Sequence, residues 1–232
     1  MIYGLHGWPD LEVGKVATRV GTVLAATDEF IIKVRGRGCH AAYPHLGVDP
    51  VVVAAHMVTA LQSIASRRVA PTDNVVVTVG AIHAGTTFNV IPQSAELMGT
   101  VRTLTEQTRT FVEDELRLIS SNVGAAFGAS VDIEWIAGYP STVNERRSTE
   151  RFQRIAEEAL GPERLAVKAH ATMGGEDFSY YGQHCPASFF LLGLRPPDWH
   201  SYPNLHTPNF DFNDDALPTG VEMMSRLVIE ND

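Results

Sequence analysis

The chain has 232 residues, 44% of them hydrophobic, and a formal net charge of −9. An acidic surface repels a phosphate backbone, so no nucleic-acid partner is expected. No apolar run approaches the roughly 20 residues of a membrane span, and no basic segment followed by an apolar one opens the chain, so we expect neither membrane association nor a secretory signal. Cys39 and Cys185 lie far apart in the sequence, which favours the reducing cytoplasm over a disulfide framework.

Residues 28–139 are predicted to contain four strands and two helices. The first strand covers residues 28–37, where apolar and polar side chains alternate. A helix follows it, because Asp49 can cap the amino end and Pro50 suits the first helical position. The other predicted elements are strands at 75–84, 94–103 and 131–136 and a helix capped by Thr105. Helical spacing predicts two buried faces: Val51, Ala55, Val58, Leu61 and Ile64 in the first helix, and Val112, Leu116, Ile119, Val123 and Phe127 in the second.

The order strand, helix, strand, strand, helix, strand is that of a ferredoxin-like, split βαβ unit. The flanks, 1–27 and 140–232, are predicted to form one α/β domain into which this unit is inserted. The second flank offers a helix at 149–160, a strand at 188–194 and a last helix at 216–229. The predicted buried face of the last helix is Leu217, Val221, Met224 and Val228. So few elements leave one sheet edge uncovered.

Five segments carry functional groups among glycines, prolines and aromatic residues. His6 and His206 each lie in such a rigid setting, which is typical of metal ligands. His40 lies in a glycine-rich loop after the first predicted strand, and Asn89 lies in the loop before Pro92. The fifth segment, 173–178, contains two glycines whose backbone N–H groups could bind an anion.

Six motifs containing these residues occur in a fixed order along the chain. They are Gly4-Leu5-His6 followed by Pro9; His40-Ala41-Ala42 with Pro44-His45 and Asp49-Pro50; Asn89-Val90-Ile91-Pro92; Gly99-Thr100-Val101-Arg102-Thr103; Gly175-Glu176-Asp177-Phe178; and Phe210-Asp211-Phe212-Asn213-Asp214. With these motifs the chain resembles the zinc-dependent amidohydrolases that include hippurate hydrolase, the N-acyl-amino-acid amidohydrolases and the indole-acetyl-amino-acid hydrolases. The resemblance extends over essentially the whole sequence.

The resemblance implies an α/β catalytic domain with a two-metal site, formed by residues 1–27 and 140–232, and a ferredoxin-like lid and dimerisation domain at 28–139. In such enzymes a metal-activated water attacks the amide carbonyl of a small N-acyl or N-aroyl amino acid. By position, His6 and His206 would each ligate one metal ion. Zinc is the expected metal, with manganese, cobalt and nickel as alternatives.

The resemblance also implies roles for residues of the lid and of the glycine-rich segment. His40 would stabilise the oxyanion, in dimeric members by reaching into the neighbouring subunit's site, and Asn89 would assist it. Arg102 is a candidate to bind the substrate carboxylate, assisted by the backbone at Gly174 and Gly175. Simpler interpretations remain open: Asn89 can stabilise a turn, and Arg102 can pair with a surface carboxylate. Glu176 and Asp177 are interpreted as helix-capping residues.

The chain departs from the family pattern in one major respect. The family's upstream segment supplies a Cys-x-His-type pair, an acidic bridging ligand and a Glu-Glu pair with the general base, whereas His6 is already near the start of this sequence. We therefore expect an incomplete catalytic domain and a chain that is inactive, or nearly so, by itself. The alternative is a non-catalytic dimerisation or binding module derived from this family. Two smaller departures are Cys39, where glycine is frequent, and Gly175, where serine is frequent.

Overall fold

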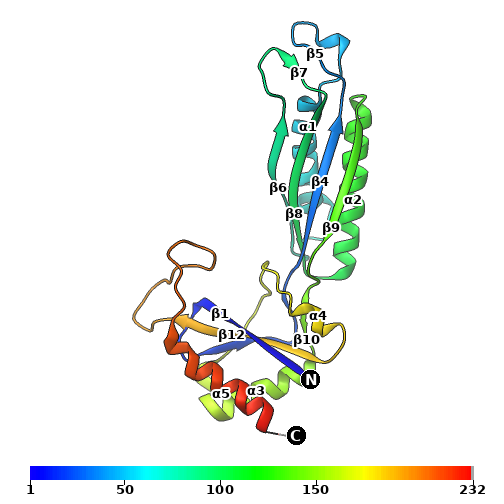
Figure 1. Cartoon of the computed structure of the whole chain (residues 1–232). Helices are drawn as coiled ribbons and strands as arrows, with labels where there is room; N and C mark the ends of the chain where they lie inside the picture. Colours follow the sequence, from blue (N-terminus) through cyan, green and yellow to red (C-terminus); the bar gives the residue numbers. More distant parts are fainter. Residues whose placement is uncertain (231–232) are drawn as a thin grey trace. The chain divides into compact units, whose positions relative to one another are not determined.

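The computed structural model describes residues 1–230 and divides into two compact units (Figure 1). Unit 1 consists of residues 1–24, 142–172 and 176–230, and unit 2 consists of residues 25–141 and 173–175. Each unit has its own sheet and its own hydrophobic core. No helix within residues 1–230 is both long enough and apolar enough to cross a membrane.

Unit 2 has the predicted βαββαβ order. Its main elements are β4 (Ala26–Arg35), α1 (Pro50–Ser63), β6 (Val75–Ala84), β8 (Ser94–Thr103), α2 (Glu106–Ala126) and β9 (Ser130–Ala137). The sheet order is β6-β8-β4-β9, with every neighbouring pair antiparallel, which is the ferredoxin-like arrangement. A short pair, β5 (Cys39–His40) and β7 (Val90–Ile91), forms the tip of unit 2, at the end of the sheet where β4 and β6 finish and β8 begins (Figure 1).

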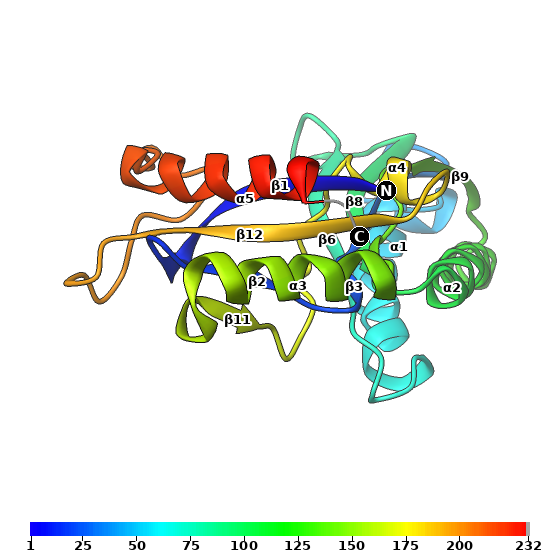
Figure 2. The same ribbon diagram turned by 90° about the horizontal axis from the view of Figure 1, so that it is seen from below.

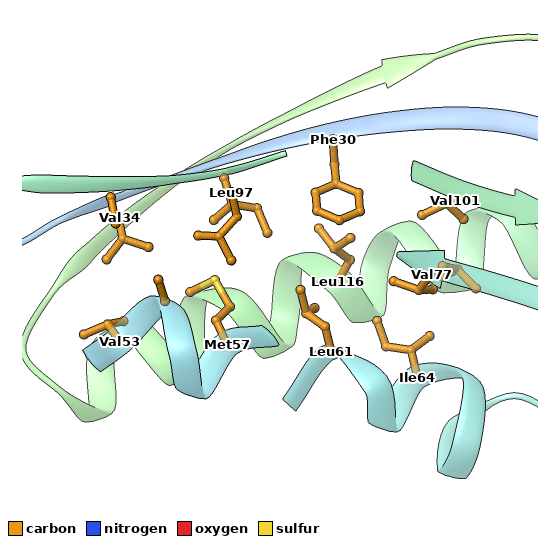
Figure 3. Close-up of a cluster of buried hydrophobic side chains, with 14 of the residues drawn as sticks. Phe30, Val34, Val53, Met57, Leu61, Ile64, Val77, Leu97, Val101 and Leu116 are labelled. Carbon is orange, nitrogen blue, oxygen red and sulfur yellow. The ribbon is translucent and has the colours of Figure 1, made fainter. Parts of the chain in front are cut away.

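The core of unit 2 fills the space between the sheet and the two helices (Figure 3). The two predicted caps are confirmed: the Asp49 side chain accepts from the Val51 N–H at 2.9 Å, and Thr105 accepts from the Thr108 N–H at 3.1 Å. The predicted buried faces are partly wrong, because Val51 is 44% and Phe127 41% exposed. In α1 the buried side chains near its start are Pro50, Val53, Ala54 and Met57. The first turns of α1 carry apolar residues on every side of the helix, so the spacing of these residues does not show which face is buried.

Unit 1 contains a four-stranded sheet of order β1-β12-β2-β11. The strands are β1 (Ile2–Glu12), β2 (Val16–Thr18), β11 (Leu165–Val167) and β12 (Ala187–Arg195), and a two-stranded pair is formed by β3 (Gly21–Leu24) and β10 (Thr142–Asn144). The helices are α3 (Arg146–Leu160), α4 (Ser179–Gly182) and α5 (Leu217–Ile229). Helices α3 and α5 lie side by side over one face of the sheet (Figure 2).

Strand β12 is the centre of unit 1. Phe190, Leu192 and Leu194 pack toward α3 and α5, while Phe189 and Leu191 pack on the opposite face. Strand β1 runs parallel to β12 and is an edge of the sheet.

The predicted buried face of α5 is wrong at three of its four positions, since only Met224 packs against the core. Leu217, Val221 and Val228 are 50%, 64% and 78% exposed, and the buried residues of the helix include Met223 and Leu227 instead. The helix carries apolar residues on two sides, so periodicity alone selects no face. Gly220 lies on the packed side of the helix, where a Cβ would lie 3.1 Å from the Leu192 side chain on β12.

Helix α3 begins at an unusual acidic cap, and this gives a first prediction. Glu145 accepts hydrogen bonds from the N–H groups of Ser148 and Arg147 and from the Ser148 hydroxyl, which lower its pKa. A lowered pKa means that the cap stabilises the fold above the ordinary value of 4.5 and that this stability is lost as pH falls through the folded-state pKa. Glu145→Gln should therefore flatten the fall of the urea unfolding midpoint below pH 4.5. Glu150→Gln, in an exposed ion pair with Arg146, is the control and should leave the slope unchanged.

Candidate active site

His6 is held on β1 with one ring nitrogen free. Its Nδ1 lies 2.7 Å from the carbonyl oxygen of Gly7. A carbonyl oxygen can only accept, so Nδ1 carries the proton and the neutral ring keeps a lone pair on Nε2. Side chains alternate along a strand, and Ile2 and Trp8 pack on the face away from α3 and α5, so His6 belongs to that face. This is the tautomer that can ligate a metal ion through Nε2.

Glu176 lies close enough to His6 for the two groups to interact electrostatically. Burial raises the pKa of Glu176, as does its hydrogen bond with Asp177, whereas the nearby His6 acts in the opposite direction. Gly4 on β1 lies against the ring of Phe178, two residues after Glu176, because a Cβ at Gly4 would lie 2.7 Å from that ring. Interpreting Glu176 only as a helix-capping residue missed this neighbour. In the sequence, Gly174 and Gly175 before Glu176 and Gly4 before His6 were the residues that could have indicated close packing of the two segments.

His206 lies in the loop that follows β12. Its φ is +61°, and it is the non-glycine residue with positive φ among residues 1–230. The turn is held by Asn204, whose side chain accepts from the Leu205 N–H at 2.8 Å and whose carbonyl accepts from the Thr207 hydroxyl at 2.7 Å. A strained histidine backbone fixed in this way is characteristic of functional loops.

The end of the same loop is anchored on the sheet. The Asn213 amide donates to the carbonyl oxygen of Leu194 at 2.9 Å. The ring of Phe212 covers Gly7, where a Cβ would lie 3.0 Å from it. The loop is thus attached to β12 and to the residue next to His6, at the carboxyl ends of two parallel strands (Figure 1).

The described residues do not provide enough ligands for a metal ion. Within residues 1–230 no three His, Cys, Asp or Glu side chains are grouped so that they could hold a metal ion. Protein zinc sites normally use three or four protein ligands. His6 fits a ligand role by its tautomer, but the described residues do not complete a metal centre among themselves.

The tip of unit 2 presents two exposed hydrogen-bond donors. The Ala42 N–H donates to His40 Nδ1 at 3.0 Å, so the neutral ring carries its proton on Nε2. The Thr87 hydroxyl donates to Asn89 Oδ1 at 3.1 Å, which leaves the Asn89 NH₂ group available. The Ala41 N–H donates to the Asn89 carbonyl, and His40 pairs with Val90, so the backbone segments that carry His40 and Asn89 run side by side. Two fixed N–H donors are the groups that stabilise an oxyanion.

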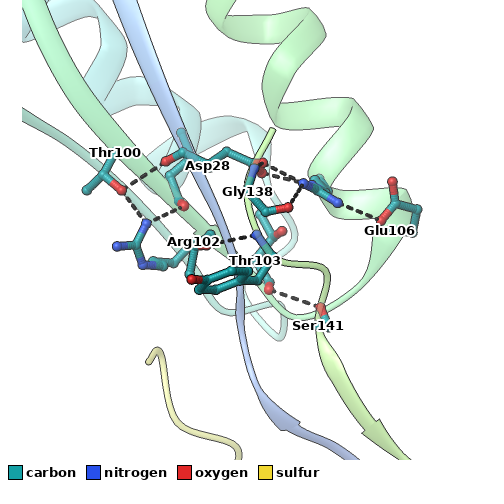
Figure 4. A network of polar contacts seen from close by, with 11 residues as sticks. Asp28, Thr100, Arg102, Thr103, Glu106, Gly138 and Ser141 are labelled. Atoms are coloured by element: carbon teal, nitrogen blue, oxygen red, sulfur yellow. Dashed lines mark hydrogen bonds and ion pairs between the residues drawn. The ribbon is translucent and has the colours of Figure 1, made fainter. Parts of the chain in front are cut away.

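Arg102, at the other end of the same sheet, lines a pocket of about 370 Å³ with Gly175. Its Nη1 donates to the Thr100 hydroxyl and to the Val101 carbonyl, the latter at 3.0 Å (Figure 4). The glycine-rich segment is fixed against β4, since the Ala25 N–H donates to the Gly174 carbonyl at 2.8 Å. Arg102, Gly174 and Gly175 thus belong to one region of unit 2.

The side chain of Thr27 leaves no room for a Cβ at position 175, which explains the glycine there and gives a second prediction. A Cβ at Gly175 would lie 2.1 Å from Thr27 Cγ2. Gly175→Ser should therefore lower the free energy of unfolding by about 1–3 kcal/mol through overpacking. Thr27→Ser removes that methyl group and keeps the hydroxyl that accepts from the Tyr139 N–H. The double variant should recover most of the loss in urea unfolding; additive losses would contradict the assigned contact.

Comparison with known proteins identifies the class of unit 2. Residues 27–127 match the family model described as a peptidase dimerisation domain. The chain is 40% identical over 225 residues to the N-acetyldiaminopimelate deacetylase of Enterococcus faecalis, covering 96% of this chain and 57% of that protein. It is 36% identical over 200 residues to the N-acetyl-L-cysteine deacetylase of Bacillus subtilis, covering 86% of this chain and 47% of that protein.

A solved structure shares the fold. The crystal structure of Bacillus subtilis YxeP, described as a dinuclear metal-binding peptidase from the M20 family, matches with a TM-score of 0.78 and 28% identity over 97% of this chain and 55% of that one. The resemblance drawn from the motifs is therefore confirmed: the chain is related to the amidohydrolases and deacetylases of the M20 family. It spans 47% and 57% of the length of the two curated relatives.

Proposed function

We propose that this chain is part of a metal-dependent amidohydrolase that cleaves the amide bond of a small N-acyl amino acid. One observation supports this most directly: His6 and His40 are fixed in opposite tautomers. His6 keeps a lone pair on Nε2, as a metal ligand must, and His40 keeps a proton on Nε2, as an oxyanion donor must. Each is set by one backbone hydrogen bond, so neither needs to rearrange.

The remaining roles follow from the donors that each residue leaves available. Asn89 adds a second donor beside His40 for the carbonyl oxygen of the substrate. Arg102 binds the substrate carboxylate, and the backbone at Gly174 and Gly175 completes that end of the site. A pair of divalent metal ions, when bound, activates water for attack on the amide carbon. His6 and His206 contribute ligands to it, zinc being the expected metal.

Assembly and location are part of the same proposal. Unit 2 pairs with a second copy of the chain, as the match to a peptidase dimerisation domain suggests. The exposed tip with His40 and Asn89 then serves the site of the partner. Cys39 and Cys185 are both free thiols, which suits a cytoplasmic protein.

Complementation tests the proposal. The chain would be produced alone and together with the part of the Enterococcus faecalis relative that has no counterpart in it. We expect little metal and no hydrolysis of N-acetyl amino acids for the chain alone, and about two metal ions per chain with chelator-sensitive hydrolysis after complementation. Hydrolysis by the chain alone that resists chelator would contradict the proposal. A stable dimer that never gains metal would favour a non-catalytic dimerisation module.

His206 gives a third prediction, which separates stability from function. Glycine adopts φ near +61° without strain, so His206→Gly should keep or slightly raise the unfolding midpoint. The same change removes the imidazole and should lower the metal content of the complemented protein. His45→Gly, at an exposed position in the short 3-10 helix Pro44–Leu46 to which no metal role is assigned, is the control for losing a histidine. Unchanged metal content in His206→Gly would exclude His206 as a ligand.

A further inference from the structure

The pocket around Arg102 also contains an acidic residue. It lies entirely within unit 2 and is lined by Thr27, Glu29, Arg102, Ile136, Gly138, Tyr139 and Gly175. Thr27 on β4 pairs with Arg102 on β8, and Glu29 pairs with Thr100, so Glu29 is the diagonal neighbour of Arg102 on the same face. Diagonal neighbours in an antiparallel sheet are about 7–8 Å apart. A guanidinium and a carboxylate therefore face one pocket from two adjacent strands.

These two charges do not neutralise each other. Neither Glu29 nor Arg102 takes part in an ion pair within residues 1–230, and Arg102 instead donates to Thr100 and to the Val101 carbonyl. Two other pairs of opposite charges on this face do form ion pairs: Lys33 lies 3.7 Å from Glu96, and Arg35 lies 2.7 Å from Asp132. The pocket thus keeps one positive and one negative group free for a ligand.

A ligand with both charges suits this pocket better than a ligand with one. A carboxylate bound by Arg102 would also meet the Glu29 carboxylate, and an amine bound by Glu29 would meet Arg102. A molecule with an ammonium and a carboxylate on one carbon satisfies both groups at once. The exposed sides of Ile136 and Tyr139, 39% and 41% exposed, offer apolar contact to the rest of such a molecule.

We infer that this pocket binds the head group of a free α-amino acid, with the carboxylate on Arg102 and the ammonium on Glu29. The inference rests on the proposed function for the role of Arg102 and adds a role for Glu29. Two sources supply such a head group. Hydrolysis converts the neutral amide nitrogen of an N-acyl amino acid into an ammonium beside the same carboxylate. Alternatively, the substrate carries a second, unacylated amino acid centre.

Binding to the complete 232-residue chain tests the inference without catalysis. The probes are L-leucine, N-acetyl-L-leucine, which lacks the ammonium, and 3-methylbutylamine, which lacks the carboxylate. In NMR titrations L-leucine should bind about tenfold more tightly than either analogue, as expected for one added charge-assisted hydrogen bond. Glu29→Gln should reduce leucine binding to the level of N-acetyl-leucine, and Arg102→Gln should reduce it to the level of the amine.

A matched control lies on the same face of the sheet. Glu134 on β9 pairs with Ile31 on β4 and does not line the pocket, so Glu134→Gln should change nothing. Equal binding of leucine and N-acetyl-leucine, or an equal loss in Glu134→Gln and Glu29→Gln, would overturn the inference.

A fourth probe separates the two sources. N-acetyl-LL-diaminopimelate has an amide at one end and a free head group at the other. If it binds as tightly as leucine, the substrate source is supported; if it binds as weakly as N-acetyl-leucine, the head group is that of the product. Failure of the binding inference is distinct from failure of the proposed function, because a pocket that does not select leucine is still compatible with hydrolysis by the complemented protein. Conversely, leucine selectivity without any hydrolysis would refute only the proposed function.

Discussion

Replacing Asp28 with alanine should be among the most destabilising single changes in unit 2. The Asp28 side chain is fully buried, and Arg109, 13% exposed, donates to both of its oxygens, with Nε at 2.8 Å and Nη2 at 2.5 Å. This hydrogen bond raises the pKa of Arg109 above its ordinary value, so the guanidinium stays charged. Without Asp28 the mostly buried Arg109 keeps only the exposed Glu106, 3.4 Å away, as an ion-pair partner. Breaking a buried pair in this way costs about 3–5 kcal/mol.

The effect should reach the pocket, because Asp28 lies between two of its lining residues. One Asp28 oxygen also accepts from the Gly138 N–H at 3.1 Å, which holds the backbone next to Tyr139 (Figure 4). Asp28→Ala should therefore weaken leucine binding as well as lower the urea midpoint.

Asp132→Ala is the matched control, since Asp132 pairs with Arg35 at the exposed surface of the same sheet, where both side chains are more than 60% exposed. It should cost under about 1 kcal/mol. Equal losses for Asp28→Ala and Asp132→Ala would contradict the assigned importance of burial.

Local chemistry made unit 2 predictable. Asp49 with Pro50 and Thr105 mark helix starts that depend only on neighbouring residues, and both caps form as expected. The alternation through Phe30, Ile32 and Val34 identifies β4, and these three side chains are all buried.

Rotation of the helices was less predictable, because it depends on the surface against which each helix packs. In α5 the exposed stripe is as regular as the buried one, and the buried one is set by contacts such as that of Gly220 with Leu192. Such a contact between residues distant in sequence leaves no periodic signal.

Within the candidate site, residue types were easier to identify than their partners. His6, His40 and Asn89 were selected from their motifs. Their hydrogen-bond partners are the Gly7 carbonyl, the Ala42 N–H and the Thr87 hydroxyl, and these contacts depend on the local backbone conformation, which the motifs do not specify. Glu29 escaped notice because it is an ordinary exposed residue of a strand. Thr27 pairs with Arg102, so Glu29, two residues further along β4, lies near Arg102 on the same face. This proximity can be recognised only when the strand register is known.

Asn144→Ala should have a comparably large effect in unit 1. The side chain of Asn144 is buried and makes four hydrogen bonds: its amide donates to Thr18 Oγ1 and to the carbonyl oxygens of Arg19 and Phe189, and its oxygen accepts from the Phe189 N–H at 2.7 Å. Alanine would leave the buried Phe189 N–H without an acceptor and leave a cavity. We expect a loss of about 3–5 kcal/mol in urea unfolding.

The loss should extend to the neighbourhood of His6 through packed rings. Phe189 contacts Phe178, with ring centroids 5.2 Å apart, and Phe178 in turn covers Gly4 on β1. Asn144→Asp tests the geometry more sharply, because a second carboxylate oxygen in place of the amide would face two carbonyl oxygens, so it should be no more stable than alanine. Asn122→Ala, at an exposed site on α2, is the control and should cost under about 0.5 kcal/mol. If Asn144→Asp were as stable as the parent chain, the amide could not be the group that orders these carbonyls.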